Sequence, residues 1–240
     1  MRQTGNVARP SKRAARKAEL VQAALQSIQE RGVEGLRIRD VADTAGVSTA
    51  TVHYYFDDLD GLLTEVHAMA VERFFTGRLA EISRFDDARD KMLAMIRRGM
   101  PERSDDATTV ALYHIDNLQR ADPIRAVLGT SLFDRQVMLY HGILELGVSQ
   151  GHFTLTDRKI DIAQNLVALE DAYCMHIIEG NTSLPYERCV ELMLSYARLA
   201  TGCAEFNTGS PCPDGPQPDS ASSTGSGRVQ RSPRRGLMNK

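Results

Sequence analysis

The chain has 240 residues, of which 42% are hydrophobic and 25% charged, so its composition is that of a globular protein with one or two domains. No apolar run approaches the roughly 20 residues that span a bilayer, and none follows the basic start of the chain, so we expect no membrane segment and no secretory signal. Four cysteines without a CxxC pair favour a reduced protein in the cytoplasm.

The net charge of −2 hides an uneven distribution of charge along the chain. Residues 1–17 carry six basic side chains and no acidic one, whereas residues 59–202 carry an acidic excess. A positive segment beside an acidic body favours contact with a polyanion, although a solvated leader explains the charge alone equally well. We expect residues 1–10 to be a disordered basic arm.

Helical periodicity fills the chain from residue 11 to about residue 202, and no alternating strand pattern appears, so the predicted fold is all-α. Pro123 and Pro185 stand where helices commonly begin, and Thr156 and Asp157 offer capping side chains. The stretch 203–240 is rich in Gly, Pro and Ser and predicts a disordered tail. The predicted helices are 11–31, 39–45, 49–56, 59–81, 86–99, 106–120, 123–150, 157–179 and 185–201.

Two short helices joined by a glycine turn are predicted between residues 38 and 56. Gly46 supplies the turn, and Ser48 caps the second helix, whose inner face holds Val52 with Tyr55 or Phe56. This arrangement predicts a helix-turn-helix, whose second helix enters the major groove of DNA. A helical hairpin without a DNA role is the alternative, but the basic arm and the polar, aromatic outer face favour DNA.

The candidate DNA-contacting residues lie on the second helix and at the start of the first. Small residues at the start of the second helix let its backbone approach the groove closely, and two arginines before and within the first helix can meet phosphate. The predicted contacts are Arg37, Arg39, Ser48, Thr49, Ala50, Thr51, His53, Tyr54 and Tyr55.

The stretch RIRDVADTAGVSTATVHYYFDDLDGLL resembles the DNA-binding signature of the TetR family of bacterial transcription regulators. The matching parts keep their spacing without gaps and are Val41-Ala42, Ala45-Gly46-Val47-Ser48, Tyr55-Phe56 and Leu62-Leu63. Leu36, His53 and Leu59 stand where the family often has Thr, Tyr and Lys, and the last two positions normally touch DNA phosphates. The resemblance implies a homodimer with two reading heads on a helical body that binds a small effector.

The expected organisation is a basic arm over 1–10, a helix-turn-helix DNA-binding domain over 11–58, a helical effector-binding and dimerisation domain over 59–202 and a tail over 203–240. The body more weakly resembles the choline-sensing, BetI-like branch of the family, at residues 120–125, 151–153 and 168–172. In this family the last two body helices, here 157–179 and 185–201, pair with their twofold mates, which implies that the homodimer forms through them.

Polar side chains set among apolar ones on three body helices are candidates for an effector pocket. Burying such groups is costly unless they are paired, so a ligand or a partner side chain must be available, although satisfied core groups or solvent-facing residues are the alternative. Adjacent carboxylates near aromatic rings suit a cationic or polar-headed organic effector. The candidates are Tyr113, His114, Phe133, His141, Glu170, Asp171 and Tyr173.

No catalytic motif of the GxGxxG, GxxxxGK[ST], HExxH or GxSxG type supports an enzyme, so we expect no enzymatic activity and no cofactor. No two histidines are spaced to grip a metal from one helix face, and no metal site is predicted. A metal- or redox-responsive regulator that uses His176 with Glu179, or cysteines, is an alternative, as is a helical interaction module without DNA binding. The sequence favours a ligand-responsive repressor that a small molecule releases from a palindromic DNA operator.

Overall fold

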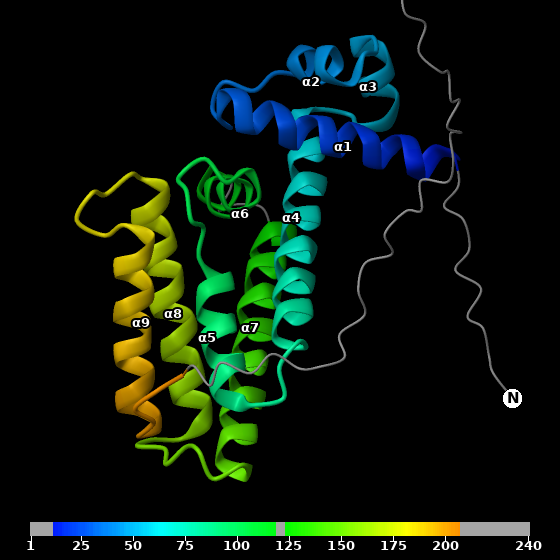
Figure 1. The fold of residues 1–240 in the computed structure, drawn as a ribbon. Helices are drawn as coiled ribbons and strands as arrows, with labels where there is room; N and C mark the ends of the chain where they lie inside the picture. The colour runs from blue at the N-terminus through cyan, green and yellow to red at the C-terminus, as the bar shows by residue number, and fades with distance from the viewer. Residues whose placement is uncertain (1–11, 119–122, 207–240) are drawn as a thin grey trace, which may run out of the picture.

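The computed structural model describes residues 12–118 and 123–206, so the predicted arm and most of the predicted tail lie outside the described residues (Figure 1). The described residues form helices and no strands, which confirms the all-α prediction. No helix among them is both long and apolar enough to cross a membrane. In chain order the helices are α1 (Lys12–Arg31), α2 (Ile38–Ala45), α3 (Thr49–Tyr55), α4 (Leu59–Ile82), α5 (Ala88–Gly99), α6 (Ala107–Leu118), α7 (Pro123–Ser149), α8 (Lys159–Ile178) and α9 (Tyr186–Thr201).

Local capping chemistry explains most helix ends. Gly46 ends α2 in the left-handed region, with φ of 64°, where residues with a Cβ are strained. Pro123 is the first residue of α7 and Pro185 the N-cap of α9, as predicted. The predicted cap of α8 is wrong: its N-cap is Arg158, without a side-chain bond, because the Asp157 carboxylate accepts instead from the Arg158 amide at 2.8 Å.

Two hydrophobic cores meet along α4. The first core joins α1, α2 and α3 to the N-terminal part of α4 and to α6, and it includes Leu62 and Ile115. The second core joins the C-terminal end of α4 to α5, α7, α8 and α9. Figure 1 shows α1–α3 above the upper end of α4, whose lower part lies beside α7. The predicted domain boundary at residue 58 therefore separates two segments of the sequence, but the two segments pack against each other through α4.

The last two helices, α8 and α9, run side by side at one edge of the body (Figure 1). Small residues, Ala168 and Ala172, are exposed on α8. On α9, Leu199 is 73% exposed. The edge of the body formed by these two helices thus carries apolar side chains that the single chain leaves uncovered.

Candidate DNA-binding head and effector cavity

The turn between α2 and α3 is built by backbone and capping hydrogen bonds. After Gly46, the Val47 amide donates to the Ala42 carbonyl oxygen at 2.9 Å. The Ser48 hydroxyl oxygen accepts from the Thr51 amide at 3.1 Å, which caps α3. Val52 is fully buried below the helix. The turn and this anchor together fix which face of α3 points outward.

The outer face of α3 presents most of the predicted DNA contacts. Thr49, Ala50 and His53 are exposed, as is the capping Ser48, and Tyr54 is 69% exposed. Thr51 and Tyr55 are half-buried. The Thr51 hydroxyl shares a 2.9 Å hydrogen bond with the Ser48 hydroxyl, and Tyr55 packs against the first core. These two residues therefore lie at the edge of the presented face rather than at its centre.

One basic side chain lies against this face, and two others are exposed at the start of α2. The guanidinium of Arg13, on α1, lies 5.8 Å from the centre of the Tyr54 ring, a cation–π distance. Arg37 and Arg39 are exposed at the start of α2, and the Arg37 amide donates to the Asp40 carboxylate at 2.9 Å. The Arg13–Tyr54 contact joins two helices far apart in the sequence, so no local pattern could reveal it.

A cavity of about 80 Å³ lies between α4, α6, α7 and α8. Three of the predicted effector residues meet there: the Tyr113 hydroxyl donates to the Asp171 carboxylate at 2.8 Å, and Phe133 forms part of the wall. Helical periodicity does not show which polar residues face such a cavity, and it failed to indicate His67 and Gln136. The complete lining is His67, Leu112, Tyr113, Leu132, Phe133, Gln136 and Asp171.

The other predicted effector residues do not line this cavity. Glu170 is fully buried and bonded to Arg78, because adjacent positions on a helix point about 100° apart and only Asp171 faces the cavity. Tyr173 packs, partly buried, against the second core. His141 is half-buried on α7, and the side chain of His114 lies outside the described residues.

A buried ion pair between Arg78 and Glu170 joins α4 to α8. Neither side chain has any exposed surface, and both terminal nitrogens of the guanidinium donate to the carboxylate. The Tyr140 hydroxyl donates to the same carboxylate at 2.8 Å, and Arg78 also donates to the Met95 carbonyl at 3.2 Å and to the Gln136 side-chain oxygen. The helical pattern could not reveal this pair, whose members are 92 positions apart.

Burial is the largest single effect on the protonation of Arg78, but the groups around the guanidinium together act against it and prevail. Burial lowers the pKa of the guanidinium, whereas the charge of Glu170 and its hydrogen bond raise it, and the net effect is an elevated pKa. Arg78 therefore stays charged in the core. Its Nε atom has no hydrogen-bond partner among the residues that the structure describes. An interior cation with one unsatisfied donor depends strongly on its remaining partners.

The pKa of the Asp171 carboxyl is raised towards neutral pH. Burial and the neighbouring charge of Glu170 raise its pKa to about 6, against the opposing effects of the Tyr113 hydrogen bond and of Arg78. At neutral pH the cavity therefore contains one carboxylate, held by a tyrosine hydroxyl and placed beside the Phe133 ring. A negative charge beside an aromatic face suits a small organic cation.

We expect Asp171→Asn to stabilise the protein at neutral pH and to have little effect at low pH. The folded-state pKa lies above the ordinary value of 3.8, so the stability that protonation contributes is present below that value and is lost as pH rises through about 6. Asparagine keeps an acceptor for Tyr113 without the charge. The free energy of unfolding obtained from thermal melts should be about 1–3 kcal/mol higher for the variant at neutral pH. An equal difference at all pH values would contradict this expectation.

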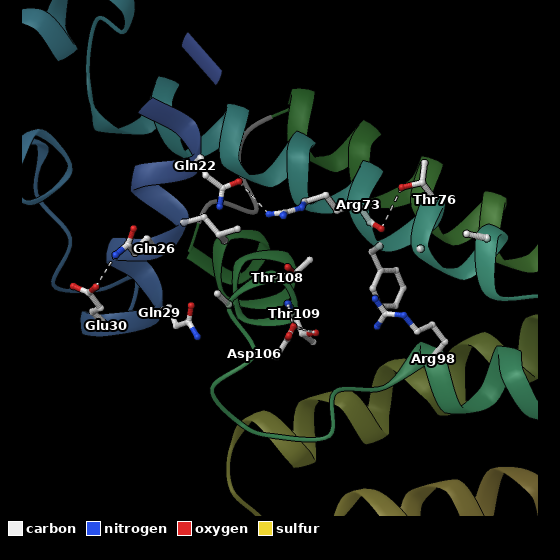
Figure 2. Close-up of a pocket in the computed structure, with 15 residues that line it drawn as sticks. Gln22, Gln26, Gln29, Glu30, Arg73, Thr76, Arg98, Asp106, Thr108 and Thr109 are labelled. Carbon is white, nitrogen blue, oxygen red and sulfur yellow. Dashed lines mark hydrogen bonds between the residues drawn. The ribbon is translucent and has the colours of Figure 1, made fainter. Parts of the chain in front are cut away.

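A second, larger hollow is an open polar groove of about 1130 Å³ where α1 meets the body. Figure 2 shows Gln22, Gln26 and Gln29 of α1 on one side and Arg73 of α4 reaching towards Gln22, to which it donates at 3.2 Å. Arg98 closes the far end. Beside this open groove, α1 contacts the body mainly through α4 and α6.

The residues named for a metal- or redox-responsive alternative are dispersed. Across residues 12–118 and 123–206 no group of three or more potential metal ligands is found. The Nδ1 atom of His176 lies 3.3 Å from the side-chain amide of Asn181, at the end of α8. Cys174, Cys189 and Cys203 are free and buried.

The sequence matches one family model and individual known proteins. Residues 20–66 match the family model described as bacterial regulatory proteins, tetR family. The HTH-type transcriptional repressor KstR2 of Rhodococcus jostii is 25% identical over 154 residues, which are 64% of this chain and 74% of that protein. The HTH-type transcriptional regulator BetI of Burkholderia thailandensis is 48% identical over 48 residues, which are 20% of this chain and a quarter (25%) of that protein.

Solved structures share the fold. A TetR transcription regulator from Haloarcula marismortui has a TM-score of 0.70 at 20% identity and covers 78% of this chain and 98% of its own. A transcriptional regulator from Saccharomonospora viridis, in complex with choline, has a TM-score of 0.70 at 20% identity and covers 77% of this chain and 96% of its own.

The capped hairpin of α2 and α3, mounted on an all-helical body, defines a helix-turn-helix transcription regulator. Residues 20–66 match the tetR family model, so the resemblance of residues 37–63 to the DNA-binding part of that family is confirmed. The similarity to BetI is real but covers one short stretch.

Proposed function

We propose that the protein is a homodimeric transcriptional repressor that acts on DNA in the cytoplasm and that a small cationic or polar-headed effector releases from a palindromic operator. The observation that carries this proposal is the exposed face of α3, which a cap and a buried anchor aim outward beside Arg13. The repressor KstR2, a relative over most of its own length, supports repression rather than activation.

In this proposal α3 enters the major groove. Thr49, His53 and Tyr54 reach the base edges or the groove floor, since they are exposed on the helix and their side chains can form hydrogen bonds. Arg37 and Arg39 neutralise backbone phosphate and fix the register of the head without reading sequence.

The uncovered edge of α8 and α9 supports the homodimer. Ala168 and Ala172 allow a partner helix to approach closely, and Leu199 would be covered by a second copy. A twofold axis through this edge would place two heads on successive major grooves, which is what a palindromic operator needs.

The cavity around Asp171 supports an organic cation as the effector. A carboxylate, a tyrosine hydroxyl and a phenyl ring line the same cavity, and the structural relative from Saccharomonospora viridis was solved with choline. A cation held by charge and an aromatic face gains about 0.5–2 kcal/mol from the ring alone. An effector that prefers one spacing of the heads shifts the population away from the DNA-binding form.

Operator binding tests the proposal. DNA fragments bound by the purified protein would be selected, and the affinity of Thr49→Ala with Tyr54→Ala would be measured on them. We expect a loss of at least about 100-fold, because each base contact contributes about 1–3 kcal/mol. The fold should survive, since both side chains are exposed.

Thr76→Ala with Tyr186→Phe is the matched control, because it removes a hydroxyl from the same two residue types on the body. It should leave operator affinity within about twofold of the unaltered protein. Equal affinities of the head variant and the unaltered protein would show that α3 does not read DNA.

A further inference from the structure

Gln136 is the residue that touches both the cavity and the buried ion pair. Its side chain is 2% exposed and forms part of the cavity wall. Its Oε1 atom accepts a hydrogen bond from an Arg78 terminal nitrogen, the same nitrogen that donates to Glu170. One side chain on α7 thus connects a possible binding cavity with the charge that joins α4 to α8.

Arg78 holds the lower part of α4 in the second core. The upper part of α4, from Leu62 to Phe74, is packed with the head in the first core. Within the described residues, Arg78 is the charged side chain of α4 that is buried at 0% exposure, and its contacts reach α5, α7 and α8. Arg78 is thus bonded to the body from the same helix whose upper part packs with the head.

The guanidinium is sensitive to the loss of an acceptor. Its Nε atom already lacks a partner, and Glu170 and Met95 cannot satisfy the remaining donors alone. Leaving another buried donor of a charged group unpaired is unfavourable, which favours a shifted position of Arg78.

We propose that Gln136 is the positioning residue through which an occupant of the cavity moves Arg78, and with it α4 and the head. An occupant that displaces the Gln136 side chain, or takes its oxygen as an acceptor, removes that oxygen from Arg78. Glu170 then acts as the fixed end of the ion pair rather than as an effector ligand. The inference rests on the proposed function, because it assumes that head position controls operator binding.

A bulky side chain can replace the unknown effector in the test. Leu132→Trp places a larger ring at the cavity wall, and because the chain has no tryptophan, its emission reports whether the ring is buried. Leu112→Trp, from another part of the wall, is the second variant if the first emits as an exposed ring. Operator affinity of the full chain is the main measurement.

Gln136→Met removes the acceptor for Arg78 while keeping the length of the side chain. Tyr140→Phe is its matched control, since it removes a buried hydrogen bond to the same Glu170 carboxylate from a residue that does not line the cavity. Loss of stability alone should affect both variants alike, whereas coupling should affect only the first.

We expect the tryptophan variant and Gln136→Met each to lower operator affinity about tenfold, and the double variant to lower it no further. Tyr140→Phe should stay within about twofold of the unaltered protein. Losses that multiply in the double variant, or a Gln136→Met protein with normal affinity, would overturn the inference.

A measurement without DNA separates this inference from the proposed function. Amide exchange in α4 should rise near Arg78 in the tryptophan variant and in Gln136→Met, with no further rise when they are combined. An unaltered protein that binds no operator refutes the proposed function, whatever the exchange shows. Unchanged exchange in α4 in both variants refutes the role of Gln136 even in a protein that binds its operator.

Discussion

Replacement of Arg78 by methionine is expected to lower the free energy of unfolding by about 3–5 kcal/mol, because it leaves the Glu170 carboxylate buried without its counter-charge. The pair has no exposed surface, and Tyr140 alone then donates to the carboxylate. Denaturant unfolding monitored by circular dichroism measures the loss. A change of less than about 1 kcal/mol would mean that the pair is solvated in solution.

Two control variants test whether the lost charge, rather than the lost packing, causes this decrease in stability. Arg135→Met removes a half-buried arginine that bonds the exposed Glu72 at 3.1 Å, and we expect a cost below about 1 kcal/mol. Arg78→Met combined with Glu170→Leu should recover most of the stability, since apolar side chains of similar size often replace a buried pair without loss. A double variant as unstable as the single one would assign the loss to packing instead of charge.

Gly99→Ala is expected to cost about 1–3 kcal/mol or more, because it overfills the core beside the same carboxylate. A methyl group on Gly99 would lie 2.3 Å from the Glu170 carboxyl carbon, well inside van der Waals contact. The carboxylate cannot retreat without stretching its bonds to Arg78. Thermal and denaturant unfolding of the purified variant measure the loss.

Gly142→Ala is the matched control, since Gly142 is also helical and a methyl group there meets nothing within 4 Å. It should stabilise the protein by about 0.5–1 kcal/mol through the lower flexibility of alanine in the unfolded chain. If both variants changed stability by the same amount, helix propensity rather than the Glu170 contact would be the cause.

Local chemistry made the helices predictable. The left-handed turn at Gly46 and the cap at Ser48 each depend on residues within four positions, and both occur as expected. The capping pattern fails where a side chain has another donor within reach. The Asp157 carboxylate accepts from the adjacent Arg158 amide and does not cap α8. Periodicity therefore predicted the fold and the position of the recognition helix.

Hydrophobic periodicity could not predict the hydrogen-bond partners of the buried polar side chains. Glu170 and Asp171 are neighbours of the same residue class, yet one bonds Arg78 from α4 and the other accepts from Tyr113 of α6. Which carboxylate faces a cavity depends on the rotation of α8 against three other helices. The sequence shows only a broad apolar stripe along this helix, and such a stripe does not determine how the helix is rotated about its axis. The pattern therefore indicated both carboxylates as candidates without showing which one pairs with Arg78 and which one faces the cavity.

The sharing of α4 between two cores limits how this protein can be recombined with relatives. A chimera joined at residue 58 would remove Leu62, Val66 and Phe74 from the core that they complete, because these residues pack under the head. A junction after Phe74 would keep the first core's share of α4 with its own head, leaving the contacts of α6 and of Leu132 on α7 to be matched. For the same reason heat should unfold head and body in one transition. The temperature at which the head unfolds is then set by the stability of the body to which it is packed.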